Sequence, residues 1–329
     1  MVKISNLLNL KKRRLFLAFT FSLCAVLGQA QMISTPIVGA LEQIEASSSK
    51  IKTTLPNHLK AGQGVIVAVI DSGVREDIPG LQGKLLPGAD LVSAERNPRH
   101  NRSNNFAPDS PSDVCPLSKR QLADAVFVHG TDVASTIVMN GGNGVAGIVP
   151  IKVTGACEAS RRDLIDGLLW AAGFHIEGLQ DNDNPAQIIN ISMAGGGNSC
   201  NQTLQKTISS ILDKGIVIVS AAGNTFGGSA REPAVCNGVI SVGSINPDQS
   251  KTYYTAVDER ISLYALGNSL VSADELSFFD NSFRNTAKVS SCETDSCSHI
   301  APASVNDLFF GTSYSAALIS GKIASAVLK

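Results

Sequence analysis

Short runs of apolar, mostly β-branched residues recur along this chain and are separated by stretches with helical periodicity. Such runs are typical of strands that are buried on both faces of a parallel sheet. They occupy residues 65–70, 151–154, 187–192, 216–221 and 238–243. Apolar residues at helical spacing lie at 130–139, 160–174, 201–214 and 312–328. This alternation predicts an α/β fold with three layers, in which a central, mostly parallel sheet carries helices on both faces.

The composition is that of a globular protein, and the length fits one large domain or two small ones with an ample core. Of 329 residues, 43% are hydrophobic and 17% are charged, which argues against long disorder, collagen and coiled coil. Residues 1–30 hold five of the 27 basic side chains and no acidic one, so that 22 basic and 28 acidic side chains remain. A body with a net charge of about −6 and no basic run argues against nucleic acid as a partner.

The first residues have the pattern of an export signal. Four basic residues at 11–14 precede an apolar run at 15–28, and Gly28 and Ala30 are small residues at the two positions that a signal peptidase reads. The run is too short for a comfortable membrane span, although an uncleaved anchor stays open. We expect a secreted or periplasmic monomer that is free of the membrane after signal removal. The predicted parts are a signal peptide at 1–30, an N-terminal segment at 31–60 and a folded domain at 61–329.

Cysteine usage agrees with export. Cys24 would leave with the signal, and an even number remains: Cys115, Cys157, Cys200, Cys236, Cys292 and Cys297. In an exported chain six cysteines indicate three disulfides, for which fifteen pairings are possible. The rival is a metal site, but only Cys292 and Cys297 are closely spaced, and no second Cys or His pair matches them.

Four polar residues stand where parallel sheets form sites, near strand ends and helix starts. Asp71 and Asn224 follow two of the apolar runs, and His129 and Ser313 precede helical patterns. Each has an ordinary structural explanation, such as a turn cap for Asp71 or a helix cap for Ser313. Together they supply a nucleophile, a base, a carboxylate that orients the base and an amide donor for an oxyanion. Hydrolysis of an acyl group requires these four groups.

The segments around these residues resemble the subtilisin-like serine proteases, the subtilase family. The resemblance runs from about Val65 to the C-terminus and is carried by AVIDSGV, HGTDVAS, IINISMAGGG, VSAAGN, PAVCNGVISVGS and GTSYSAALISG. It implies a subtilisin-like fold in which Asp71 orients His129, His129 acts as general base and then acid, and Ser313 is the nucleophile. It also implies an oxyanion hole made by the Asn224 amide and the Ser313 backbone N–H, peptide or protein substrates, and no cofactor for catalysis.

Further site residues follow from the same resemblance. An edge that pairs with the substrate backbone as an added strand would consist of Ser192, Met193, Ala194 and Gly195. Gly223 and Arg231 are also candidate substrate-binding residues. Arg231 would lie near the base of the primary specificity pocket, and we hypothesise that it favours an acidic residue before the cleaved bond. The alternative is that Arg231 points to solvent beside Glu232.

The chain is most similar to the extracellular proteobacterial branch of this family, whose members share a long loop between the Asp and His motifs. Residues 94–121 are rich in polar residues and predict such a loop here. The likeness implies the disulfides Cys115–Cys157 and Cys200–Cys236, which leaves Cys292 with Cys297.

Departures from the family pattern lie beside the catalytic positions. Asp132 replaces a second His, Ser135 a Gly, Tyr314 a Met and Ala317 a Pro. None removes a catalytic atom, but each changes the packing around one. Gly80 stands where many relatives have a calcium-binding Asp, which argues against the common structural calcium site. Asp77 or residues 140–143 are candidates for a weaker site.

Two functions remain open on this sequence. One is an exported serine endopeptidase, and the other is a catalytically inactive subtilase-fold protein that binds or scaffolds. The second is motivated by a chain that ends sixteen residues after Ser313 and by the departures from the family pattern beside the catalytic positions. The presence of Asp71, His129 and Asn224 together with Ser313 favours the first. A non-proteolytic esterase is disfavoured because the Gly-x-Ser-x-Gly elbow is missing.

Overall fold

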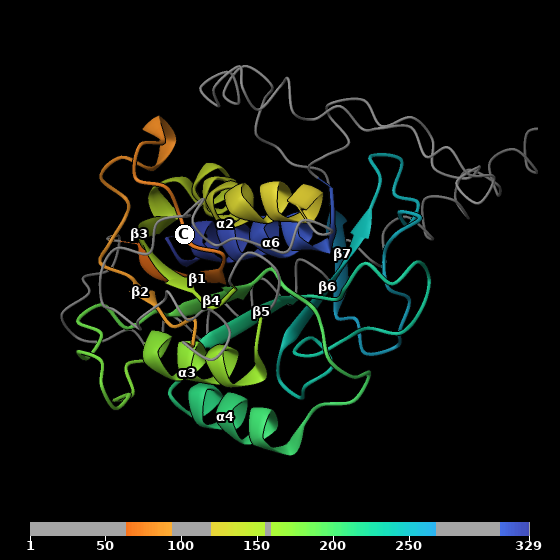
Figure 1. Ribbon diagram of the computed structural model, residues 1–329. Helices are drawn as coiled ribbons and strands as arrows, with labels where there is room; N and C mark the ends of the chain where they lie inside the picture. The colour runs from red at the N-terminus through yellow and green to blue at the C-terminus, as the bar shows by residue number, and fades with distance from the viewer. Residues whose placement is uncertain (1–63, 94–119, 155–158, 268–309, 329) are drawn as a thin grey trace, which may run out of the picture. The chain divides into compact units, whose positions relative to one another are not determined.

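Seven parallel strands form the sheet that carries the candidate site (Figure 1). The computed structural model describes residues 64–93, 120–154, 159–267 and 310–328, and only the backbone of residues 120–128. All of these lie in the unit Ile44–Lys329. Every neighbouring pair is parallel in the order β2-β3-β1-β4-β5-β6-β7. The bounds are Val65–Asp71 (β1), Ala89–Asp90 (β2), Val145–Lys152 (β3), Ile188–Ile191 (β4), Val217–Ala221 (β5), Ile240–Ile245 (β6) and Leu263–Leu266 (β7).

Helices cover both faces of this sheet. On one face lie α2 (Arg120–Gly141) and α6 (Thr312–Val327), and on the other lie α3 (Arg161–Ala171) and α4 (Gln202–Asp213) (Figure 1). Two short 3-10 turns complete the described elements, η1 (Pro79–Leu81) and η3 (Gly142–Gly144). The three-layer α/β fold predicted from the alternation of patterns is therefore confirmed.

The core lies between the sheet and its helices, and burial explains why the strands are apolar throughout. Ile70, Ile151 and Ile189 come from neighbouring strands and are fully buried in one cluster with residues of α3 and α4. Helix α4 contributes Ile208 and Ile211 to the same cluster, at the spacing of one helix face. Removing each such side chain from water contributes roughly 2 kcal/mol to the free energy of unfolding.

The strands expected at 187–192, 216–221 and 238–243 match β4, β5 and β6 to within two residues. Two other elements begin earlier than predicted. Strand β3 was expected from residue 151 and begins at Val145, and helix α2 was expected from residue 130 and begins at Arg120. The short strands β2 and β7 were not predicted.

Helix α2 approaches two other segments so closely that glycine is required. At Gly130 a Cβ atom would overlap the carbonyl oxygen of Gly73, in the loop that follows β1. At Gly321 of α6 it would lie 2.6 Å from the carbonyl oxygen of Ile137. These glycines let α2 lie directly against the end of β1 and against α6, which brings His129 toward Asp71 and toward the start of α6.

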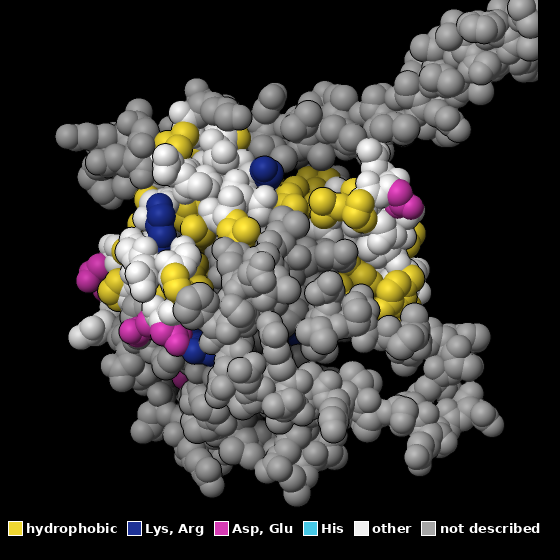
Figure 2. Space-filling model, turned by 90° about the horizontal axis from the view of Figure 1, so that it is seen from above, with side chains coloured by type: hydrophobic (Ala, Val, Ile, Leu, Met, Phe, Trp, Pro, Cys, Tyr) yellow, Lys and Arg dark blue, Asp and Glu magenta, His cyan; other side chains and the backbone are white. Residues whose placement is uncertain are grey.

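The surface of the described residues carries mixed side chains. On the face seen in Figure 2, the described Lys and Arg side chains are scattered among apolar and uncharged ones. No helix in the described part of the chain is both long enough and apolar enough to cross a membrane.

Candidate active site

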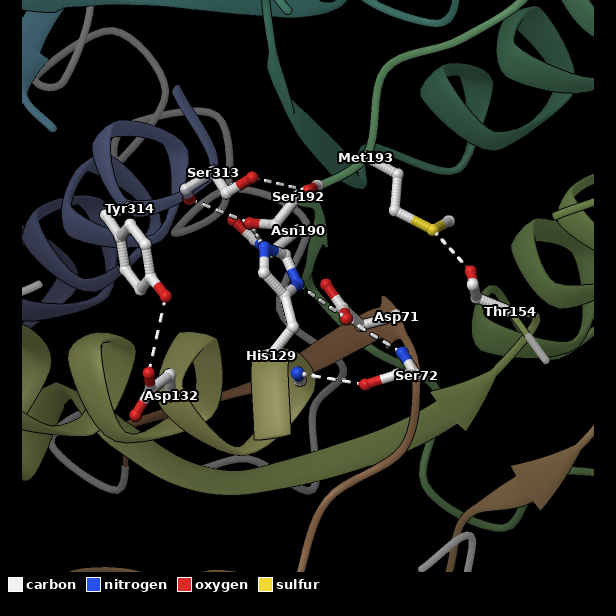
Figure 3. A network of polar contacts seen from close by, with 11 residues as sticks. Asp71, Ser72, His129, Asp132, Thr154, Asn190, Ser192, Met193, Ser313 and Tyr314 are labelled. Carbon is white, nitrogen blue, oxygen red and sulfur yellow. Dashed lines mark hydrogen bonds and ion pairs between the residues drawn. The ribbon is translucent and has the colours of Figure 1, made fainter. Parts of the chain in front are cut away.

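A carboxylate and an imidazole are hydrogen-bonded at the carboxyl end of β1 (Figure 3). Asp71, the last residue of β1, is only 2% exposed. Its Oδ1 lies 2.8 Å from Nδ1 of His129 and also accepts the backbone N–H of Ser72 at 2.7 Å. Because an ionised carboxylate only accepts hydrogen bonds, Nδ1 must carry the proton, and Nε2 is then the basic nitrogen of a neutral ring.

The segment after β1 also fixes the helix that carries His129. The backbone N–H of Gly130 donates to Ser72 Oγ at 3.1 Å. Ser72 therefore holds α2 at the residue next to His129, while Asp71 holds the ring itself. Asp71 Oδ2 is buried and has no hydrogen-bond partner among the described residues.

Ser313 lies in the first turn of α6 and is bonded twice to Ser192, just beyond the end of β4. Ser192 Oγ donates to the carbonyl oxygen of Ser313 at 2.8 Å, and Ser313 Oγ donates to the carbonyl oxygen of Ser192 at 2.7 Å (Figure 3). In this structure the Ser313 hydroxyl is therefore hydrogen-bonded to Ser192 and not to His129. A serine hydroxyl moves between staggered rotamers at small cost, so this arrangement is one of its accessible positions.

A buried polar chain supports Ser192 from inside the sheet. Asn190 Nδ2 donates to Ser192 Oγ at 2.9 Å, and Asn190 Oδ1 accepts from Ser320 Oγ at 2.9 Å. Asn190, Ser192 and Ser320 are all buried. These hydrogen bonds connect β4 to α6 and hold the backbone of Ser313 in place. Sequence analysis missed Asn190 and Ser320, although an Asn inside an apolar strand is a detectable signal, because a buried amide needs partners.

The amide of Asn224 is held in one orientation by Thr312. Asn224 Oδ1 accepts the backbone N–H of Thr312 at 3.0 Å and its hydroxyl at 3.1 Å. Thr312 Oγ1 in turn accepts the N–H of Gly223 at 3.1 Å. Since the oxygen of the amide faces Thr312, its NH₂ group is the part that can donate to a ligand. Thr312 is a further site residue that sequence analysis did not single out.

The expected substrate edge is already paired on one side. Gly195 N–H donates to the carbonyl oxygen of Glu232 at 2.9 Å, and Glu232 N–H donates to Gly197 at 3.1 Å. Because successive residues of an extended segment point to opposite sides, the backbone groups of Ala194 face away from Glu232. The edge available to a substrate strand therefore centres on Ala194.

The remaining specificity candidates lie together. A Cβ atom at Gly223 would be 3.3 Å from the Ala194 Cβ and 3.6 Å from the Arg231 Cγ. Arg231 is exposed, and its guanidinium forms no ion pair with any described side chain. The neighbouring Glu232 is buried and pairs with Arg161 instead, at 2.9 Å.

The carboxyl group of Asp132, one helical turn after His129, is unusual because it is buried. Asp132, on α2, is 2% exposed, and its Oδ2 accepts from the hydroxyl of Tyr314 at 3.3 Å (Figure 3). Burial raises the pKa of Asp132 to about 6, although the charge of His129 and the Tyr314 hydrogen bond act in the opposite direction. Burial, together with the carboxyl of Asp132, raises the pKa of Tyr314 well above its ordinary value.

The structure contains the disulfide Cys200–Cys236, in agreement with the pairing that the resemblance implied. The other expected pairs involve Cys115, Cys157, Cys292 and Cys297, which lie outside the described residues.

No group of three or more His, Cys, Asp or Glu side chains within the described ranges is arranged to hold a metal ion. Asp77, one candidate for a weak calcium site, is hydrogen-bonded to Arg75, with its Oδ1 2.9 Å from Nε. That hydrogen bond lowers the pKa of Asp77.

Comparison with known proteins shows the family to which this fold belongs. The model of the subtilase family matches residues 62–328, and the chain belongs to that family. An extracellular basic protease of Dichelobacter nodosus is 37% identical over 228 residues, which cover 64% of this chain and 37% of the relative. An extracellular protease of Xanthomonas campestris pv. campestris is 34% identical over 225 residues, which cover 64% of this chain and 38% of the relative. The resemblance to the extracellular proteobacterial branch is thereby confirmed.

Solved structures agree. Proteases from Pseudoalteromonas arctica share 31% identity with a TM-score of 0.54, over 64% of each chain. A lanthipeptide protease, at 16% identity and a TM-score of 0.50, is similar in fold; the match covers 78% of this chain and 71% of that one. This chain spans less than two-fifths of the length of the two curated relatives.

Proposed function

We propose that this protein is an exported serine endopeptidase that acts through Asp71, His129 and Ser313. The observation that carries the proposal is the 2.8 Å hydrogen bond between buried Asp71 and His129, at a strand end that faces the anchored first turn of α6. A buried carboxylate that fixes the tautomer of an imidazole is the arrangement by which a histidine becomes a general base for a serine.

The proposed reaction begins when the Ser313 hydroxyl rotates from the Ser192 carbonyl to Nε2 of His129. His129 takes the proton as Ser313 Oγ attacks the substrate carbonyl carbon, and Asp71 stabilises the imidazolium that forms. The imidazolium then protonates the leaving amine, and the peptide C–N bond breaks to leave an acyl-Ser313 ester. Water, deprotonated by His129, hydrolyses the ester and restores the free hydroxyl.

The negative oxygen of each tetrahedral intermediate requires donors that are already in place. The Asn224 NH₂ group is suited to this role because Thr312 fixes the amide oxygen on the other side. The second donor would be the backbone N–H of Ser313, since N–H groups in the first turn of a helix have no intrahelical acceptor. The substrate strand would pair with Ala194 and with the Ser192 carbonyl once Ser313 has left it.

The specificity proposal concerns Arg231. Its side chain is exposed beside Gly223, and Glu232 is bound to Arg161, so no acidic side chain in the described ranges pairs with the Arg231 guanidinium. A glutamate before the cleaved bond would pair with this guanidinium. We expect cleavage of Glu-containing peptides to fall in Arg231→Ala and to be unchanged in Arg162→Ala, which removes an exposed arginine from α3. Equal cleavage of Glu, Phe and Leu peptides by the wild type would refute this preference.

The decisive test of the activity is labelling by a fluorophosphonate probe, with Ser313→Ala and Ser210→Ala beside the wild type. Ser210 is an exposed serine of α4 and serves as the control. Labelling of the wild type and of Ser210→Ala, but not of Ser313→Ala, would support an activated Ser313. A folded wild type that takes no label would favour the alternative, an inactive subtilase-fold binding or scaffolding protein, in which Ser313 stays bonded to Ser192.

A further inference from the structure

Two residues that depart from the family pattern touch each other. By the family resemblance, Asp132 replaces a second His and Tyr314 replaces a Met, and the Tyr314 hydroxyl lies 3.3 Å from Asp132 Oδ2. Each adjoins a residue of the proposed triad. Asp132 lies one helical turn after His129 on α2, and Tyr314 follows Ser313 on α6. The pair therefore forms one hydrogen-bonded unit that adjoins two residues of the proposed triad.

This unit places a second buried carboxyl group close to the imidazole. Asp132 is 2% exposed and Tyr314 is 4% exposed, and the Tyr314 ring centroid lies 6.0 Å from that of His129. The titratable groups that act on Asp132 are His129 on its own helix, Asp71 at the end of β1 and Tyr314 on α6. No Lys or Arg among the described residues forms an ion pair with it. Within the described part of the chain, the cation that acts on Asp132 is protonated His129.

We propose that Asp132, held by the Tyr314 hydroxyl, is a positioning residue that stabilises the imidazolium form of His129 together with Asp71. The expected effect of Asp132 on the reaction rate rests on the proposed function, whereas its expected effect on the titration of His129 does not. Two carboxylates that act on one imidazole, Asp71 by direct hydrogen bond and Asp132 through its charge, would favour the imidazolium that forms as Ser313 loses its proton. They would also keep His129 protonated, and therefore inactive as a base, to a higher pH.

The titration range of Asp132 makes this coupling relevant near neutral pH. Burial raises its pKa to about 6, close to the range in which a histidine titrates. Two interacting groups that titrate in the same range lose their protons in coupled steps, and the proposal predicts such coupling between Asp132 and His129.

The first experiment follows the imidazole signals of His129 by NMR between pH 4.5 and 9, with His129→Gln used to assign them. In Asp132→Asn we expect the midpoint of the His129 titration to fall by at least about 0.5 pH unit, because one attractive charge is lost. Asn keeps the size of Asp and an oxygen that accepts from Tyr314. Asp213→Asn, which removes an exposed carboxylate from the end of α4, is the control for net charge and is expected to leave the midpoint unchanged.

Tyr314→Phe is the second variant and keeps the carboxyl group. Without the hydroxyl Asp132 stays protonated to a higher pH, so the His129 midpoint is expected to fall by less than in Asp132→Asn. Adding Tyr314→Phe to Asp132→Asn is expected to cause no further shift, because the two act through one interaction. A midpoint that is the same in wild type and Asp132→Asn, within about 0.1 pH unit, would overturn the proposal.

The second experiment measures kcat and KM across the same pH range. In Asp132→Asn the rising limb of kcat is expected to move to lower pH in parallel with the NMR midpoint, while kcat on the plateau falls several-fold and KM stays close to that of the wild type. A uniform drop at all pH values would indicate a structural role alone and would contradict the proposal. If no variant hydrolyses substrate but the NMR midpoint still shifts, the proposed function fails while the Asp132–His129 coupling holds.

Discussion

Asp71 engages two donors with a single carboxylate oxygen. Oδ1 accepts from Ser72 N–H and from the His129 ring, while buried Oδ2 has no partner among the described residues. A neutral Asn would keep the size of the side chain but lose the charge that stabilises the imidazolium, and its NH₂ group can turn toward the ring and favour the wrong tautomer. We expect Asp71→Asn to lower kcat by ~10³–10⁴-fold with little change in KM.

This prediction is checked by steady-state kinetics at pH 8 on a peptide that the wild type cleaves. Circular dichroism and a thermal melt of the variant establish that it is folded. Because Ser72 still has an oxygen acceptor in Asp71→Asn, the fold is expected to survive. A folded variant that retains more than a tenth of the wild-type kcat would show that Asp71 does not orient the base.

Ionisation of Asp132 is also expected to lower the free energy of unfolding as pH rises. Its pKa is raised to about 6 in the folded state and is near 4 in an unfolded chain. Between these values the folded state holds a proton that the unfolded state has lost, so stability falls as pH rises. The loss is complete above about pH 6 and amounts to roughly 3 kcal/mol.

Asp132→Asn lacks this titration. We therefore expect the melting temperature of the variant, relative to that of the wild type, to rise between pH 4 and pH 7. Thermal or urea unfolding at several pH values measures the difference. A difference that stays constant over this range would contradict a buried, ionising Asp132.

Some residues of the candidate site could be identified from the sequence, whereas their contacts with one another could not. Asp71, His129, Asn224 and Ser313 could be found because each lies in a recognisable motif near a predicted strand end or helix start, although the structure places His129 inside α2. The orientation of Ser313 toward Ser192 could not, because it depends on a rotamer and on contacts between residues 121 positions apart. The pairing of Asp132 with Tyr314 was also hidden, since both were visible only as separate departures from a pattern.

At the level of elements, β3 shows why part of the fold escaped prediction. Gly147 and Pro150 interrupt the apolar pattern, so the strand was predicted only from residue 151. In a parallel sheet alternate residues bond to the same neighbour. Ile148 bonds to Lys84 and Leu86, away from β1, and Pro150 therefore has its missing N–H on that same side. The ladder between β1 and β3 loses no bond, and the proline is tolerated.

Helix α2 was shortened in prediction by Gly130, because glycine within a helix is unfavourable by about 1 kcal/mol and resembles a boundary. The structure shows that the close approach to Gly73 requires it. The edge strand β7 (LYAL) is only four residues long and contains no β-branched residue, so it gave no signal. In both cases tertiary contacts overrode a local preference.

The disulfide Cys200–Cys236 joins the start of α4 to the segment before β6, across a sequence separation of 36 residues. Closing a loop of this length in the unfolded chain is expected to stabilise the fold by roughly 3–4 kcal/mol. The bond adjoins Asn201, which caps α4 through Thr203 N–H and whose own N–H donates to buried Glu232. Breaking it should therefore loosen this end of α4 first.

We expect Cys200→Ser/Cys236→Ser to lower the free energy of unfolding by this amount, measured by urea unfolding at the same pH as the wild type. Hydrogen exchange is expected to rise first at the start of α4, while α6 stays protected. The single variant Cys236→Ser is a poor control because it leaves a free thiol, so Ser209→Ala/Ser210→Ala on the exposed face of α4 is used instead. A double cysteine variant as stable as the wild type would show that the bond adds nothing to this fold.

The whole chain combines a family domain at residues 62–328 with a segment of different composition before it. Residues 1–30 contain basic and apolar residues but no acidic one, in contrast to the acidic remainder. This contrast, the six cysteines beyond Cys24 and the extracellular relatives support export of the chain. Export would also supply the oxidising compartment in which Cys200 and Cys236 pair.

Export predicts two linked properties of the protein recovered from outside the cytoplasm. Its intact mass should lack residues 1–30, so that it begins at Gln31, and its six cysteines should give no free thiol after denaturation. Replacing Ala30 by a bulky residue, as in Ala30→Tyr, removes the small side chain that the signal peptidase reads and should leave the full-length precursor at the membrane. Gln31→Tyr, next to the cleavage point, is the matched control and should still be processed. A full-length protein held at the membrane in the wild type would establish the segment as an anchor, and free thiols in a processed protein would refute three disulfides.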